Sequence, residues 1–262
     1  MAAPAAEPLQ SHDLACGYSG RAVVQGVNLT ARRGEILTIL DGSGSGKSTL
    51  LRTLAGLAPP ISGGVRLLGR DPYALAPAER QSVMRRAGTL FQHDALFGSM
   101  SVIDNIAVPV LELTRIPRPL AYEMARAKLA LVGLSDLPHR LPSELSGGQR
   151  KRVALARAAV LDPVVLFCDE PTSGLDPATA SHVDETLLRF RDVLDAAIIA
   201  VTHDADGVRA TADRAIVLDA GRICAEGSID VLERSDHPAV HAFFHRPKAL
   251  ALRDRTGETS RS

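Results

Sequence analysis

The glycine-rich segment Gly44-Ser45-Gly46-Lys47-Ser48-Thr49 is the part of the sequence best suited to chemistry. It follows the apolar run Glu35–Leu40 and precedes a stretch that should be helical through Ala55. Glycine lets backbone N–H groups face a phosphate, and the N-terminus of a helix stabilises the same anion. Lys47 would reach the β and γ phosphates of a nucleotide, and the Ser48 hydroxyl would hold Mg²⁺. The segment therefore predicts a nucleotide site of a kind that many NTPases share.

One position departs from the usual pattern of this loop. The pattern G-x-x-x-x-G-K-[ST] places a glycine where this chain has Asp41, and Gly42 comes one position late. A carboxylate ~6 Å from a phosphate would cost about 3 kcal/mol at an effective dielectric near 20. Nucleotide binding would then be roughly a hundredfold weaker. The interpretation we prefer is that Asp41 points away from the phosphates at the strand end. Reduced affinity or a variant sequence are the alternatives.

Two acidic residues, Asp169 and Glu170, end a second apolar run, Val164–Cys168. A buried parallel strand delivers its last side chains to the carboxyl edge of its sheet, where ligands bind. We therefore expect both carboxylates to lie beside the nucleotide. The alternative is a strand that merely ends in solvated acids.

The segment Leu145-Ser146-Gly147-Gly148-Gln149 stands about a hundred residues after the glycine-rich loop and shortly before the acidic pair. With this arrangement the chain resembles the ATP-binding subunit of an ABC transporter, over about residues 8 to 245. The stretch Pro171–Asp176 matches the D-loop of that family. The resemblance implies an ATPase that uses ATP and Mg²⁺.

The resemblance also implies roles for residues whose type alone would say little. Glu170 would be the general base that polarises the attacking water, and Asp169 would support Mg²⁺. Gln92, which follows the expected strand Gly88–Phe91, matches the glutamine that senses Mg²⁺ and water. His203 matches the switch histidine at the γ phosphate. The implied catalytic residues are Glu170, His203 and Gln92, and the implied metal ligands are Ser48, Gln92 and Asp169.

Nucleotide contacts are implied on both subunits of a dimer. Tyr18 would stack on adenine, although packing as an edge aromatic is nearly as good an interpretation. Each motif occurs once, and in this family the signature segment serves the γ phosphate of the opposite subunit, which implies a homodimer. We interpret Arg150, Lys151 and Arg152, after the signature, as solvated charges. The implied nucleotide-binding residues are Tyr18, Gly42, Ser43, Gly44, Ser45, Gly46, Lys47, Ser48, Thr49, Ser146, Gly147, Gly148, Gln149 and Asp176.

The elements that must position these residues predict an α/β fold. We expect a P-loop NTPase (RecA-like) core with a mostly parallel sheet, an edge antiparallel β region and an inserted α-helical sub-domain. Leu120, Met124, Ala127 and Leu131 fall at helical spacing within that sub-domain. The expected boundaries are a disordered tail at 1–9, the nucleotide-binding core at 10–93 and 159–227, the helical sub-domain with the signature at 94–158, and a C-terminal helical extension and tail at 228–262.

The composition sets limits on the partners. The chain has 262 residues, with 30 Lys plus Arg and 30 Asp plus Glu, so no net charge favours nucleic acid or an anionic membrane. Three cysteines without a CxxC pair favour a reducing compartment. The apolar runs are too short to span a bilayer. We therefore expect a peripheral protein on the cytoplasmic face of the inner membrane, acting through an integral inner-membrane permease.

Two further resemblances bear on the transported species. Leu90–Phe97 with Met100–Ala107, and His237–Phe244, resemble the ATPase of the Mla-type phospholipid transport system. They imply phospholipid movement across the cell envelope and an anchored lipid-binding partner. We keep two alternatives: the ATPase of an importer for amino acids or another small polar solute, and an ATP-gated structural clamp whose hydrolysis Asp41 weakens.

The segment His237–Phe244 should form an amphipathic helix. Its apolar residues Val240, Phe243 and Phe244 would bury against either the chain's own core or a partner, and packing against its own core is the simpler interpretation.

Overall fold

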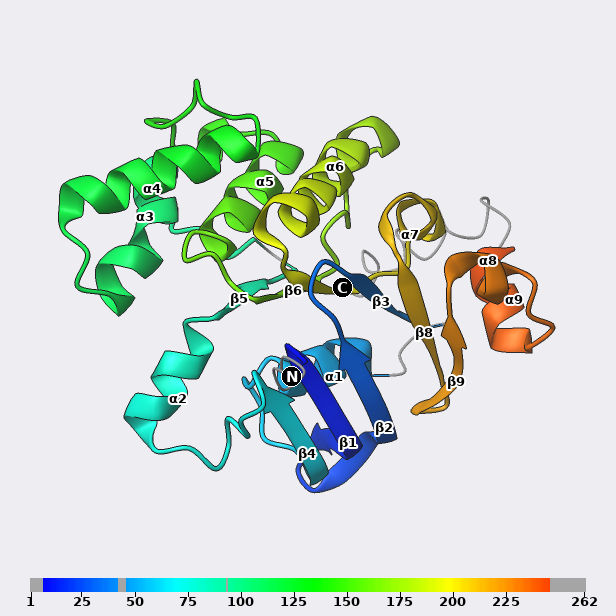
Figure 1. Ribbon diagram of the computed structural model, residues 1–262. Helices are drawn as coiled ribbons and strands as arrows, with labels where there is room; N and C mark the ends of the chain where they lie inside the picture. Colours follow the sequence, from blue (N-terminus) through cyan, green and yellow to red (C-terminus); the bar gives the residue numbers. More distant parts are fainter. Residues whose placement is uncertain (1–6, 42–45, 93, 246–262) are drawn as a thin grey trace, which may run out of the picture.

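The computed structural model describes residues 7–41, 46–92 and 94–245 (Figure 1). A six-stranded sheet of order β5-β6-β7-β3-β8-β9 forms its middle layer, and only β9 runs antiparallel to its neighbour. Every residue of β3, β6 and β7 is buried, as expected for parallel strands covered on both faces. The strands are β3 (Ile36–Asp41), β5 (Ala87–Leu90), β6 (Val165–Asp169), β7 (Ala197–Val201), β8 (Arg214–Asp219) and β9 (Arg222–Gly227).

A smaller antiparallel sheet of order β2-β1-β4 lies with α1 on one face of the main sheet (Figure 1). Its strands are β1 (Leu9–Tyr18), β2 (Arg21–Ala31) and β4 (Ser62–Leu67), and α1 spans Lys47–Leu54. Leu50 of α1 packs in one core with Leu9 and with Phe167 of the main sheet. The predicted tail through residue 9 is wrong at Leu9, which is fully buried in β1 because the strand begins there.

The opposite face of the main sheet carries the helical region (Figure 1). It consists of α3 (Val102–Leu113), α4 (Arg118–Leu131), a short 3₁₀ turn at Pro142–Glu144, α5 (Gly147–Ala158) and α6 (Pro177–Leu194). A single hydrophobic core joins these helices to the sheet. Residues 94–158 thus contain helices and no strand, while the sub-domain boundaries themselves stay a prediction.

The most buried residues of α4 are not those whose spacing predicts the helix. Ala121, Ala125 and Leu129 are buried, whereas Leu120 is 53% exposed. Met124 and Leu131 are partly buried and pack against the same core. The spacing thus predicted the helix correctly, while two small alanines share its most buried positions with Leu129.

The remaining helices are α2 (Pro77–Met84), α7 (Ala205–Thr211), α8 (Ile229–Glu233) and α9 (Pro238–Phe244). Val240, Phe243 and Phe244 of α9 are buried with Leu40 and Val217 of the main sheet. The C-terminal helix thus packs on the chain's own core, as the simpler interpretation predicted. Among the residues described, none of the helices is long and apolar enough to cross a membrane.

Candidate functional site

The strands bring the predicted site residues to one edge of the main sheet. Asp169, the last residue of β6, lies beside Val201, the last residue of β7, in parallel register. Leu90 at the end of β5 lies beside Cys168. Gln92 and His203 each follow two residues after their strands, so both leave the sheet at the same carboxyl edge. This edge is where an α/β sheet binds its ligand.

Ser48 and Asp169 are in direct contact at this edge. The Ser48 hydroxyl donates a hydrogen bond to Asp169 Oδ1 at 3.0 Å. Burial raises the pKa of Asp169, the Ser48 hydrogen bond opposes that rise, and the charge of Glu170 adds to it. A hydroxyl and a carboxylate side by side supply the hard oxygen donors that Mg²⁺ prefers. The residues present therefore fit the implied metal.

Glu170 and His203 form the second contact of the site. His203 Nδ1 lies 2.9 Å from one carboxylate oxygen of Glu170 and 2.8 Å from the other. Glu170 is 9% exposed and has a left-handed backbone with φ of 51°, which is uncommon for a residue with a side chain. Its N–H donates to the Val201 carbonyl at 2.9 Å. The strained backbone thus holds a carboxylate against a histidine at the sheet edge, an arrangement suited to proton transfer.

Asp41 does not point away from the phosphate loop, so the preferred interpretation of that residue is wrong. Its carboxylate forms an ion pair with the Lys47 ammonium. The Asp41 side chain is 1% exposed and that of Lys47 is 12% exposed. Asp41 closes β3 inside the protein, where a carboxylate needs a partner, and Lys47 supplies one. Burial lowers the pKa of Lys47, while the charges of Glu170 and Asp169 raise it.

The rest of the phosphate loop is only partly described. Gly42, Ser43, Gly44 and Ser45 lie outside the described residues. Gly46 precedes α1 with φ of 94°, and Thr49 is buried in the first turn of that helix.

Tyr18 is positioned by Thr49. The Thr49 hydroxyl donates a hydrogen bond to the Tyr18 hydroxyl at 2.8 Å, and Tyr18 is 56% exposed. The ring is thus fixed at its tip but not packed, which leaves a face free to stack. Its contact with adenine stays a prediction.

The signature segment forms the N-terminus of α5. Ser146 accepts a hydrogen bond from the Gln149 N–H at 3.2 Å, and the Gln149 side chain accepts one from the Ser146 N–H at 2.9 Å. This reciprocal pair is a capping box. A Cβ on Gly148 would lie 2.1 Å from Thr179 Cγ2, so only glycine fits against the start of α6. Asp176 caps that same helix by accepting from the Thr179 N–H at 3.0 Å. Gly147 is also close to its surroundings, since an added Cβ there would lie 3.2 Å from Leu175 Cδ2.

Lys151 and Asp94 were missed by the sequence interpretation. Lys151 is 4% exposed, so its description as a solvated charge is wrong. Its ammonium donates to the Gln92 carbonyl at 2.5 Å and pairs with Asp94 Oδ1 at 3.0 Å. The sequence did contain an indication that Lys151 is buried. Its spacing from Gly148 and Leu155 places all three residues on one face of the helix.

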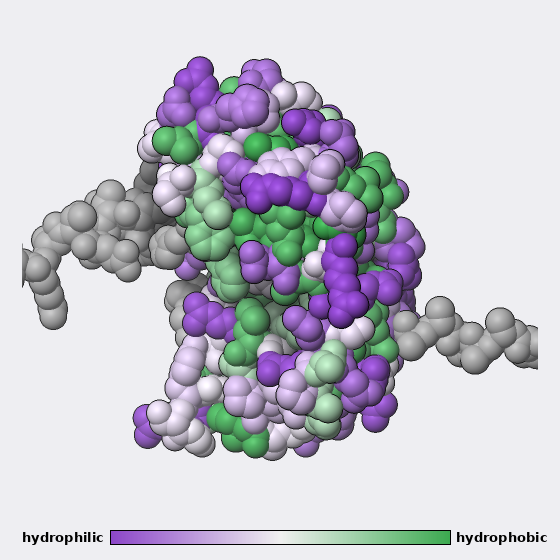
Figure 2. All heavy atoms as spheres, turned by 90° about the vertical axis from the view of Figure 1, so that its left-hand side faces the viewer, coloured by the Kyte–Doolittle hydropathy of each residue, from purple (hydrophilic) through white to green (hydrophobic). Residues whose placement is uncertain are grey.

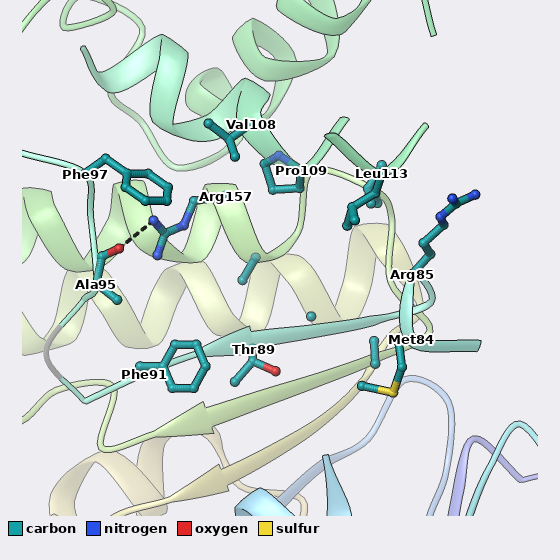
Figure 3. Close-up of a pocket in the computed structure, with 14 residues that line it drawn as sticks. Met84, Arg85, Thr89, Phe91, Ala95, Phe97, Val108, Pro109, Leu113 and Arg157 are labelled. Atoms are coloured by element: carbon teal, nitrogen blue, oxygen red, sulfur yellow. Dashed lines mark hydrogen bonds between the residues drawn. The ribbon is translucent and has the colours of Figure 1, made fainter. Parts of the chain in front are cut away.

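An apolar groove of about 500 Å³ opens between β5 and the helical region (Figure 3). Figure 2 shows hydrophobic residues gathered in a hollow on this side of the molecule. Phe91 is 40% exposed and Phe97 is 50% exposed, and Pro109 and Leu113 of α3 line the opposite wall. Arg157 donates to the Ala95 carbonyl at 2.7 Å inside the groove. The groove adjoins the site because Gln92 follows Phe91 directly.

A family model and curated relatives both match this chain. The family described as ABC transporter matches residues 24–173. The methionine import ATP-binding protein MetN of Rhizobium johnstonii is 40% identical over 229 residues, which cover 87% of this chain and 63% of that protein. The probable ribonucleotide transport ATP-binding protein mkl of Mycobacterium tuberculosis is 36% identical over 242 residues, covering 92% of this chain and 67% of the relative. The chain spans about 60% of the length of the MetN relatives.

Two solved structures have the same fold. CbiO1 from Clostridium perfringens, part of the ABC transporter complex cbiONQ, superposes with a TM-score of 0.79 at 30% identity, covering 87% of this chain and 91% of that chain. The ATP-binding cassette MJ0796, in a dimeric post-hydrolysis state bound to ADP and Pi, superposes with a TM-score of 0.75 at 27% identity, covering 84% and 98%. The predicted α/β fold is therefore confirmed.

Proposed function

The chain belongs to the ABC transporter family, and from this premise we propose that it binds and hydrolyses ATP to energise the import of an amino acid or another small polar solute. The contact between Glu170 and His203, beside Ser48 and Asp169, carries the ATPase part of the proposal. The substrate class is supported by the MetN relatives, which are named for methionine import. ATP and Mg²⁺ are the cofactors of this family.

The side chains at the sheet edge divide the chemistry among them. Glu170 accepts a proton from the attacking water, and His203 holds the Glu170 carboxylate in place. Lys47 offsets negative charge on the phosphates once it leaves Asp41. Ser48 and Asp169 would hold Mg²⁺, together with Gln92, and the ion would neutralise charge on the β and γ phosphates.

A complete site requires two copies of the chain. The phosphate loop leads into α1 and the signature opens α5, and these helices pack on opposite faces of the main sheet. A head-to-tail dimer would bring the signature of one copy to the phosphate loop of the other. The dimeric state reported for MJ0796 supports this arrangement.

The apolar groove beside Gln92 is where we place the membrane partner. A short amphipathic helix from the cytoplasmic side of a permease would bury its apolar face against Phe91 and Phe97. Movement of that helix would reach Gln92 directly, since Gln92 follows Phe91 in the chain. The chain would thus sit peripherally on the cytoplasmic face of the inner membrane.

Phospholipid transport remains a second candidate for the substrate. It rests on the sequence of Leu90–Phe97 and of His237–Phe244 alone. The relatives described above are named for methionine and ribonucleotides rather than lipids, and α9 packs on the chain's own core. The polar-solute proposal is therefore preferred.

An ATP-gated clamp with weak hydrolysis is a third candidate, and the ion pair between Asp41 and Lys47 favours it. In this case the chain would close on ATP but turn it over slowly, because Asp41 competes for the lysine that the transition state needs.

One reconstitution separates the three. The chain is purified with its permease in mild detergent and placed in vesicles with an added solute-binding protein and methionine. ATP-driven methionine accumulation supports the preferred proposal. Lipid carried by the purified complex and methionine-independent turnover support the second candidate. Tight ATP binding without multiple turnovers supports the third, and no ATP binding contradicts all of them.

A further inference from the structure

A buried ion pair joins the signature helix to the segment that follows Gln92. The side chain of Lys151 is 5% exposed and that of Asp94 is 16% exposed, with 3.0 Å between the ammonium and Asp94 Oδ1. The same ammonium donates to the Gln92 carbonyl at 2.5 Å. A buried ammonium is expensive unless such partners surround it, so this cation is fixed in one geometry. Arg150 is a looser neighbour, 3.9 Å from Asp94 and 41% exposed.

The segment held by Lys151 is strained. Asp94 and Ala95 both have left-handed backbones, with φ of 59° and 51°. Two such residues in succession, neither of them glycine, persist only where the surroundings hold them. Arg157, on the same helix as Lys151, donates to the Asp94 carbonyl at 2.8 Å and to the Ala95 carbonyl at 2.7 Å. It also lies over the Phe97 ring, 5.8 Å from its centroid (Figure 3).

These contacts connect three parts of the molecule. Lys151 comes two residues after Gln149, the end of the signature. Its carbonyl partner is Gln92 in the site, and Ala95 and Phe97 of the same segment form one wall of the groove. A displacement of α5 or of the groove wall therefore moves the backbone of Gln92 through Lys151.

We propose that Lys151 is a positioning residue for Gln92, with Asp94 as its counter-ion, and that this pair links the signature helix and the groove to the hydrolytic site. The inference rests on the proposed ATPase function. The described partners of the Lys151 ammonium are the Gln92 carbonyl and the Asp94 carboxylate. It fixes the backbone of Gln92, whose side chain would help to hold Mg²⁺.

The test compares steady-state ATPase kinetics and melting temperatures of purified variants. Lys151→Gln should lower kcat roughly 10- to 100-fold, the range seen when residues that orient metal ligands are removed. KM for ATP should stay close to the native value, because Tyr18 and Lys47 are untouched. Lys151→Arg keeps the cation and should restore most of kcat. Lys128→Gln is the matched control, since Lys128 lies on α4 and pairs with Asp162, which follows α5.

Asp94→Asn gives an independent variant, because asparagine tolerates the left-handed backbone while it removes the charge. It should lower kcat like Lys151→Gln, and the double variant should be no slower than the slower single one. An active native chain whose Lys151→Gln variant matches Lys128→Gln would overturn the inference alone. Additive effects, or a loss of kcat that follows the melting temperature and is not restored by arginine, would overturn it too. A native chain that hydrolyses no ATP would overturn the proposed function and the inference together.

Discussion

The carboxylate of Asp41 is paired with the ammonium of Lys47, the cation that we propose binds the phosphates of ATP. The Asp41 side chain is buried and that of Lys47 is only 12% exposed, so their attraction is weakly screened by solvent. Binding of ATP therefore has to break or share an existing ion pair. The same lysine lies near Asp169 and Glu170, whose charges favour its protonated form.

Removing the carboxylate should strengthen nucleotide binding. For Asp41→Gly we expect ATP affinity to rise about 10- to 100-fold, because about 1.4 to 3 kcal/mol of competing interaction disappears. Isothermal titration calorimetry with a non-hydrolysable ATP analogue measures the change. Asp41→Asn, which keeps the size of the side chain, should give most of the gain. Unchanged affinity in both variants would show that Asp41 turns away once nucleotide binds.

Glu170 should be required for hydrolysis but not for binding. Glu170→Gln should lower kcat by about 10² to 10⁴, the usual contribution of a general base, and leave a closed dimer on ATP. ATPase assays and size-exclusion chromatography with ATP and Mg²⁺ measure the two effects. Because His203 contacts Glu170 at 2.9 Å, adding His203→Ala to Glu170→Gln should cause little further loss. Normal turnover by Glu170→Gln would exclude it as the base.

Much of this site could be predicted because the motif order fixes which strand ends meet. The parallel register of β6 and β7 brings Asp169 and Glu170 beside His203, and α1, which follows β3 and the phosphate loop, brings Ser48 to Asp169. The orientation of Asp41 could not be predicted the same way. It depends on how deeply the end of β3 is buried and on which cation lies within reach.

Packing between segments that are distant in the sequence also explains what was not predicted in the helical region. Lys151 is charged and follows Arg150, so the sequence predicts that its side chain is exposed to solvent. In the structure its ammonium instead donates to the carbonyl of Gln92, in the segment after β5. The spacing of Leu120, Met124, Ala127 and Leu131 predicted the helix α4, but not that Ala121, Ala125 and Leu129 are its most buried residues. Residue size predicts a buried face only when the neighbouring helix leaves room for large side chains.

Stability should depend on pH through Asp184 of α6. Burial and, as the smaller cause, the charge of Asp204 together raise the pKa of Asp184 to about 7. A Cβ on Gly207 would lie 3.5 Å from Asp184 Oδ2 and 3.3 Å from Asp204 Oδ2, so the two carboxylates converge at the start of α7. A raised carboxyl pKa gives stability that is complete below the unfolded pKa near 4 and is lost as pH rises through about 7.

Asp184→Asn should therefore match the native chain near pH 4 and exceed it in stability above pH 7. We expect a gain of about 1 to 2 kcal/mol at pH 8, after allowance for solvent screening. Urea unfolding at several pH values measures it. Glu185→Gln, an exposed neighbour on α6, should leave the pH profile unchanged. A native profile that is flat between pH 5 and 8 would contradict the assignment.

Gly148 offers a test of the head-to-tail dimer. Gly148→Ala should disturb the signature, because the added carbon would lie 2.1 Å from Thr179 Cγ2, so the Thr179 side chain or one of the two helices α5 and α6 must shift. Overpacking of this kind costs about 1 to 3 kcal/mol. The variant should lose most ATPase activity while it retains its own phosphate loop. Gly98→Ala is the matched control, since an added carbon there meets nothing within 4 Å.

Mixing two inactive variants then decides whether the sites are shared between subunits. Lys47→Ala lacks a working phosphate loop but keeps its signature, whereas Gly148→Ala has the opposite defect. A mixed dimer would contain one site built from the two intact halves, so mixing should restore up to about one quarter of the native ATPase rate. Activity that does not return, from variants that dimerise with the native chain, would indicate that phosphate loop and signature act within one subunit.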